Sequence, residues 1–123
     1  MQRILILFIT LLLLSSCATN KEKYETIDIS TIEMKVAEDW QVVDVREIEE
    51  FNEGHIPNAL NLPLSSILQG EYGPLEQSES YIIICRSGNR SQTASEELAE
   101  AGFQIINVKQ GISSWLGEVS VTE

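Results

Sequence analysis

The residues most able to do chemistry are a cysteine and the short polar loop that follows it. Cys85 ends the apolar run Tyr81–Ile84, and a helical pattern begins at Ser91. The loop between them holds Arg86, Ser87, Gly88, Asn89 and Arg90. A cysteine between a strand and a helix lies beside backbone N–H groups that have no partner within the helix. With the two arginines, these donors favour the nucleophilic thiolate and a small oxyanion beside it.

Four further motifs lie before and after this loop. They are Asp44-Val45-Arg46-Glu47, then Phe51 with Gly54-His55-Ile56-Pro57-Asn58-Ala59, then Gly102-Phe103, and finally Gly111-Ile112-Ser113-Ser114-Trp115. Together with Cys85–Arg90 they resemble, in order and spacing, the motifs of the rhodanese family of sulfurtransferases. The resemblance covers the chain from about Thr26 to Gly117. It implies a three-layer α/β sandwich with a mainly parallel sheet of about five strands.

The resemblance also implies roles for individual residues. Cys85 would be the catalytic residue, and Asp44 and Arg46 would support its loop through an ion pair or backbone hydrogen bonds. The substrate would be bound by Arg86, Ser87, Gly88, Asn89 and Arg90. Of the two loop arginines, Arg90 is the better candidate for the donor anion, and Arg86 would set access. No metal or organic cofactor is implied.

The reaction expected from this family is sulfur transfer in two steps. The Cys85 thiolate takes the outer sulfur of a small anionic donor such as thiosulfate and becomes a persulfide. The persulfide then gives its terminal sulfur to a thiol or to cyanide. Backbone N–H groups of the loop would stabilise the anions. Because Ser87 and Asn89 are small, the loop predicts an open pocket that admits several acceptors.

Other functions compete with this one. A phosphatase or arsenate reductase also uses a cysteine and an arginine around an oxyanion, but the related phosphatases place five residues between them, and here four separate Cys85 from Arg90. A non-catalytic binding module, or a sulfur carrier or redox partner of another envelope protein, would fit the same fold. The alternative without function is an inert buried thiol.

Alternation of strand and helix patterns predicts the fold that positions these residues. Strands are expected at 26–29, 40–45, 59–62, 81–84 and 104–108, and helices at 31–37, 47–51, 64–68, 91–101 and just after Gly111. A capping-box pattern at Ser30–Glu33, with a staple between Ile29 and Met34, predicts the start of the first helix. Ligands of such sheets bind at the carboxyl ends of the strands, where Cys85 lies.

The N-terminus indicates secretion and a lipid anchor. Arg3 precedes the apolar run Ile4–Leu14, which is too short to span a bilayer and fits a signal peptide. Cys17 follows two serines and resembles the lipidated cysteine of bacterial lipoproteins. The predicted organisation is a signal peptide (1–16), a lipidated cysteine with a flexible tether (17–25), the rhodanese domain (26–119) and a short tail (120–123). The expected location is the cell envelope, on the periplasmic side of a membrane or the outer face of the cell membrane.

Charge and composition exclude other partners. The net charge of -11 argues against nucleic acid as a ligand. His55 is the only histidine, so the sequence offers no paired histidine for a metal site. We expect its ring to hold local backbone.

Overall fold

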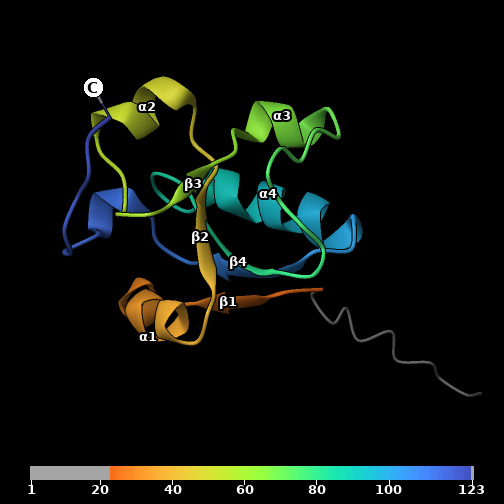
Figure 1. The fold of residues 1–123 in the computed structure, drawn as a ribbon, viewed down its shortest axis with the longest axis horizontal. Helices are drawn as coiled ribbons and strands as arrows, with labels where there is room; N and C mark the ends of the chain where they lie inside the picture. Colours follow the sequence, from red (N-terminus) through yellow and green to blue (C-terminus); the bar gives the residue numbers. More distant parts are fainter. Residues whose placement is uncertain (1–22, 123) are drawn as a thin grey trace, which may run out of the picture.

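Five parallel strands form the sheet of the computed structural model, which describes residues 23–122 (Figure 1). In chain order they are β1 (Glu25–Ile27), β2 (Gln41–Asp44), β3 (Leu60–Asn61), β4 (Ser80–Ile84) and β5 (Gln104–Val108). Their order across the sheet is β1-β5-β4-β2-β3, and every pairing between neighbours is parallel. The carboxyl ends of all five strands therefore lie along one edge. The predicted parallel, five-stranded sheet is confirmed.

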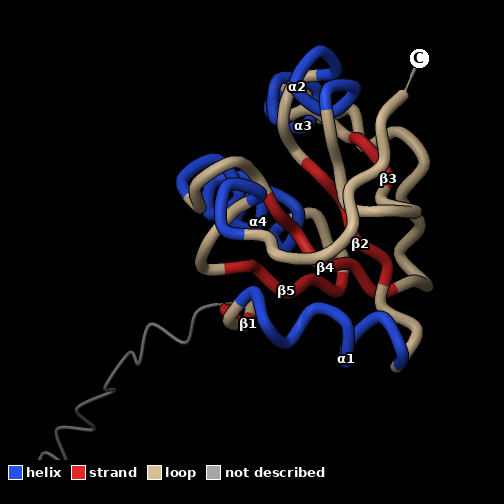
Figure 2. The backbone as a smooth tube through the Cα atoms, turned by 90° about the vertical axis from the view of Figure 1, so that its left-hand side faces the viewer, coloured by secondary structure: helices blue, strands red, loops and turns tan. Residues whose placement is uncertain are grey.

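Helices cover both faces of the sheet. They are α1 (Ile32–Ala37), α2 (Ile48–Glu53), α3 (Leu64–Leu68) and α4 (Asn89–Glu100), with 3-10 turns η1 (Ile29–Thr31) and η2 (Ile112–Ser114). Figure 2 shows α1 on one side of the sheet and α4 on the other, so the three-layer arrangement is also as predicted. Within residues 23–122, no helix has the length and apolar character needed to cross a bilayer.

The central strand β4 is buried on both faces. Ile83 packs with α4 in one core cluster, whereas Ile82 and Ile84 pack with α1 in the other, and all three are 0% exposed. Double-sided burial explains why this strand reads as an unbroken apolar run. Both core clusters, with the side chains packed against them, lie between Tyr24 and Trp115. A fragment that begins at residue 21 therefore retains the whole described core.

The structure corrects the predicted start of the first helix. Strand β1 ends at Ile27, and the Asp28 carboxylate accepts the N–H of Ser30 at 2.9 Å, which begins η1 instead of the predicted capping box. Met34 is 55% exposed, so the predicted hydrophobic staple is absent. Aspartate caps helices as well as serine does, and here it comes two residues earlier.

Helix α2, unlike α1, begins with a capping box. The Glu47 carboxylate accepts the backbone N–H of Glu50, while the Glu50 carboxylate accepts the N–H of Glu47 at 3.0 Å. Helix α4 also differs from the prediction, since it begins at Asn89 and not at Ser91. Gly88, with a φ of 102°, turns the chain directly into the helix and shortens the loop after Cys85.

Candidate active site

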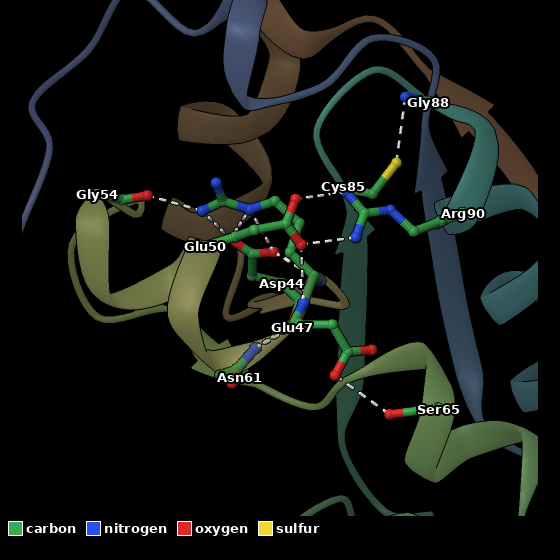
Figure 3. Close-up of polar contacts among 10 residues, drawn as sticks. Asp44, Glu47, Glu50, Gly54, Asn61, Ser65, Cys85, Gly88 and Arg90 are labelled. Carbon is green, nitrogen blue, oxygen red and sulfur yellow. Dashed lines mark hydrogen bonds and ion pairs between the residues drawn. The ribbon is translucent and has the colours of Figure 1, made fainter.

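Cys85 lies at the carboxyl end of β4, and its Sγ accepts a hydrogen bond from the N–H of Gly88 at 3.1 Å (Figure 3). The residue is only 1% exposed. Gly88 has left-handed backbone, and a Cβ added to it would collide with the carbonyl oxygen of Lys109. Only glycine therefore fits the position that turns a backbone donor toward the sulfur.

The surroundings of Cys85 favour its thiolate. Burial raises the pKa of the thiol, but hydrogen bonds from the side chain and N–H of Ser91 and from the N–H groups of Gly88 and Ser87 outweigh it. The pKa of Cys85 therefore lies below its usual value of 9.0. The Ser91 hydroxyl also lies 3.2 Å from the Gly88 carbonyl oxygen and 3.5 Å from that of Val108, so its one proton is shared among acceptors.

A second segment, residues 111–113, is hydrogen-bonded to the loop. The N–H of Ile112 donates to the Cys85 carbonyl at 2.9 Å, and the N–H and hydroxyl of Ser113 donate to the Arg86 carbonyl at 3.2 and 2.9 Å. A Cβ added to Gly111 would collide with the backbone of Arg86 and Ser87. The sequence predicted a turn at Gly111 but not this contact, because the partners are backbone atoms that carry no residue-type signal.

Arg90 is the loop arginine with an ion-pair partner. Its Nη1 and Nη2 donate to the two carboxylate oxygens of Glu50, at 2.7 and 2.9 Å (Figure 3). The side chains of Arg90 and Glu50 are 34% and 27% exposed. Arg86 is exposed and makes no ion pair within residues 23–122, and Ser87 and Asn89 are exposed beside it. Donor binding by Arg90, and by the other loop residues, stays a prediction.

Asp44 and Arg46 form a buried ion pair at the end of β2. The Asp44 carboxylate accepts the backbone N–H, Nε and Nη2 of Arg46, the last at 2.7 Å, and Arg46 Nη2 also donates to the Gly54 carbonyl at 2.7 Å. Between them, the N–H of Val45 donates to the Ile84 carbonyl at 2.9 Å, directly before Cys85. The pair thus lies at the strand end beside Cys85 without contacting the sulfur, and its support of the cysteine loop stays a prediction.

His55 has a structural role, as predicted. Its Nδ1 lies 2.8 Å from the Phe51 carbonyl oxygen, and its ring stacks on the Phe51 ring with centroids 3.8 Å apart. Among the described residues, no three His, Cys, Asp or Glu side chains are grouped so that they could hold a metal ion. Cys17, the predicted lipidation site, lies outside the described residues.

Two hollows differ in chemical character. One of about 220 Å³ lies beside the cysteine loop, between Arg46, Glu50 and Glu53 on one side and Arg86 and Ser113 on the other. A larger one of about 700 Å³ is lined by apolar side chains such as Ile32, Val36, Ile56 and Trp115, with Glu33 and Glu118. Its lining holds no cation, whereas that of the smaller cavity includes Arg46 and Arg86. The smaller cavity adjoins the cysteine loop through Arg86, although Cys85 is not one of its lining residues, and it is therefore the candidate site for a donor anion.

A parallel α/β domain with an activated cysteine at the end of its central strand defines a class of cysteine-dependent transfer domains. The chain belongs to the rhodanese family, since the model of the Rhodanese-like domain matches residues 30–118.

Relatives support this assignment. The chain is 38% identical over 98 residues to the Bacillus subtilis protein named "Putative sulfurtransferase YtwF", covering 76% of this chain and 94% of that protein. It is 32% identical over 85 residues to the thiosulfate sulfurtransferase GlpE of Shewanella oneidensis, covering 68% and 83%. The solved structure of a rhodanese-related protein from Thermoplasma volcanium superposes with a TM-score of 0.71 at 35% identity, over 79% of this chain and 98% of that one. The family and these relatives indicate sulfurtransferase activity in general.

Proposed function

We propose that this domain transfers sulfane sulfur from a donor such as thiosulfate to a thiol or cyanide through a persulfide on Cys85. The observation that carries the proposal is the Cys85 sulfur, which lies at the carboxyl end of β4 and accepts a hydrogen bond from Gly88. The same N–H groups that lower the pKa of the thiol would stabilise the terminal sulfur of the persulfide.

The two steps need no oxidant. In the first, the Cys85 thiolate attacks the outer sulfur of thiosulfate, a new S–S bond forms, and the electron pair of the old S–S bond leaves with sulfite. In the second, an acceptor thiolate attacks the terminal sulfur, and the electron pair returns to the Cys85 sulfur. Charge balances in both steps, and the cysteine alternates between thiolate and persulfide.

The test is intact mass spectrometry of a fragment from Lys21 to Glu123, in which Cys85 is the only cysteine. Thiosulfate should add the mass of one sulfur atom, and cyanide should remove it. The loading rate should rise with pH as thiolate forms and should level off with a midpoint below 9.0, because the pKa of Cys85 is lowered.

The control is Cys85→Ser, which keeps an acceptor for the Gly88 N–H but lacks a sulfur nucleophile. It should fold and gain no mass. If the folded wild-type fragment, with its thiol free, gains no sulfur from thiosulfate or from a persulfide donor, the proposal is wrong.

We also propose that the domain acts in the cell envelope, tethered by a lipid on Cys17. The support is the sequence pattern of residues 1–17 alone. Expression of the full chain with an alkyne fatty acid should label the wild type and not Cys17→Ser. An unlabelled wild-type chain, still carrying residues 1–16, would contradict this location.

A further inference from the structure

The contact that the sequence did not predict is the pairing of Arg90 with Glu50, forty positions apart. Both guanidinium nitrogens that face α2 donate to the Glu50 carboxylate, at 2.7 and 2.9 Å (Figure 3). The carboxylate also accepts the N–H of Glu47 at 3.0 Å. The capping box of α2 therefore holds this carboxylate in place, and the pair is more fixed than an ordinary surface ion pair.

The Glu50 carboxylate stays ionised at any physiological pH. The hydrogen bond from Arg90, opposed by burial and aided by the Glu47 N–H, lowers the pKa of Glu50 to about 2. The positive charge of Arg90 is thus matched by a permanent negative charge. Proton uptake near neutral pH does not release the arginine.

Arginines are also paired with carboxylates around the small cavity beside the loop. Arg46 is paired with Asp44, and Arg90 is paired with Glu50, so Arg86 is the arginine of this region without an ion pair among the described residues. The cavity lining also includes the carboxylate of Glu53. Among the described residues Glu53 makes no ion pair either, so a dianion placed here would meet one unpaired cation and one unpaired carboxylate, which gives it no net attraction.

We propose that Glu50 is a specificity-determining positioning residue that acts through Arg90. By neutralising Arg90, it disfavours the thiosulfate dianion and favours donors with a single negative charge at the reacting sulfur, namely the persulfides of small thiols. The inference rests on the proposed function. In this transfer the Cys85 thiolate bonds to the terminal sulfur of the persulfide, and the electron pair of the broken S–S bond leaves with the donor's thiolate.

The experiment compares two donors with the Lys21–Glu123 fragment. Loading of Cys85 is measured with thiosulfate and with the persulfide of 2-mercaptoethanol, which carries no other charge. Glu50→Gln should raise the second-order rate constant for thiosulfate about tenfold, because a competing charge a few ångströms away is removed. It should change the rate constant for the persulfide less than about threefold. The gain for thiosulfate should shrink at high salt.

The matched control is Glu49→Gln, which removes the same charge from an exposed neighbour in α2 and should leave both rate constants unchanged. Glu50→Asp, which keeps the charge, should keep the donor ratio of the wild type. A residue needed only for the shape of the loop would instead affect both donors alike.

An unchanged ratio of the two rate constants in Glu50→Gln, whether both fall together or neither changes, would overturn the inference. If Glu50→Gln does not fold, Arg90→Gln decides: it leaves the Glu50 carboxylate without its ion-pair partner, so it should slow thiosulfate loading about tenfold and persulfide loading less than about threefold. An equal change in both rate constants would overturn the inference. Failure of the wild type to load from either donor would instead refute the proposed function itself.

Discussion

Replacing Gly111 with alanine is expected to slow sulfur loading of Cys85 about a hundredfold and to lower the free energy of unfolding by about 3 kcal/mol. A Cβ at this position would overlap the carbonyl group of Arg86 and the nitrogen of Ser87. These are backbone atoms that cannot rotate away, so segment 111–113 must move. That movement would break its three hydrogen bonds to the loop and displace the donors around the sulfur.

Gly70→Ala is the matched control. Gly70 has a φ of 75°, but an added Cβ would meet nothing within 4 Å. It should cost only about 1–2 kcal/mol of backbone strain and leave loading unchanged. Urea unfolding, followed by the fluorescence of Trp40 and Trp115, measures the stability, and mass spectrometry measures the loading. Equal behaviour of the two variants would show that segment 111–113 does not hold the loop.

The local part of this fold could be predicted from the sequence. The run Tyr81–Ile84 identifies a doubly buried strand, and a cysteine followed by Gly88 identifies a turn into a helix. These features depend on neighbours along the chain, whose geometry the backbone largely dictates. The predicted start of α1 was wrong because local sequence offered two caps. Asp28 and Ser30 are both good helix caps, and their residue types do not decide between them.

The non-local part of the site could not be predicted. The sequence suggested a donor anion as the partner of Arg90, which stays a prediction, but it did not indicate the contact with Glu50 from another helix. Gly111 was expected to make a turn, yet what restricts it is the backbone of Arg86. Each of these contacts depends on how α2 and the segment after β5 pack against the loop. A single sequence gives charge and size at these positions, but not the partner.

The sheet order explains why the contacts meet at one place. Strands β2 and β4 are parallel neighbours, with Asp44 in register with Ile84. The loop after β2 leads into α2, which carries Glu50, and the loop after β4 carries Cys85 and Arg90. Because both loops leave the same edge of the sheet, the acidic helix lies beside the thiol. Glu50, which is proposed to set donor preference, therefore follows β2, whereas the N–H groups that activate Cys85 follow β4.

Replacing Asp44 with alanine is expected to lower the free energy of unfolding by about 3–5 kcal/mol. The side chain of Asp44 is 0% exposed and that of Arg46 is 6% exposed. Removal of the carboxylate would leave a buried guanidinium with the Gly54 carbonyl as its remaining acceptor. Since a domain of this size is stable by only about 5–15 kcal/mol, the variant should be close to unfolding at 25 °C. Urea unfolding at that temperature measures the loss.

The double variant Asp44→Ala, Arg46→Met separates the charge from the packing. Replacement of both charged partners by apolar groups should recover much of the stability, to within about 2 kcal/mol of the wild type. A loss as large as that of Asp44→Ala would mean that packing at the end of β2, and not the buried charge, causes the effect.

Loading by the folded fraction of either variant should stay within about threefold of the wild type, because Asp44 makes no contact with the Cys85 sulfur. A greater fall would show that the ion pair also sets the position of the thiol, through the Val45 N–H that bonds the Ile84 carbonyl.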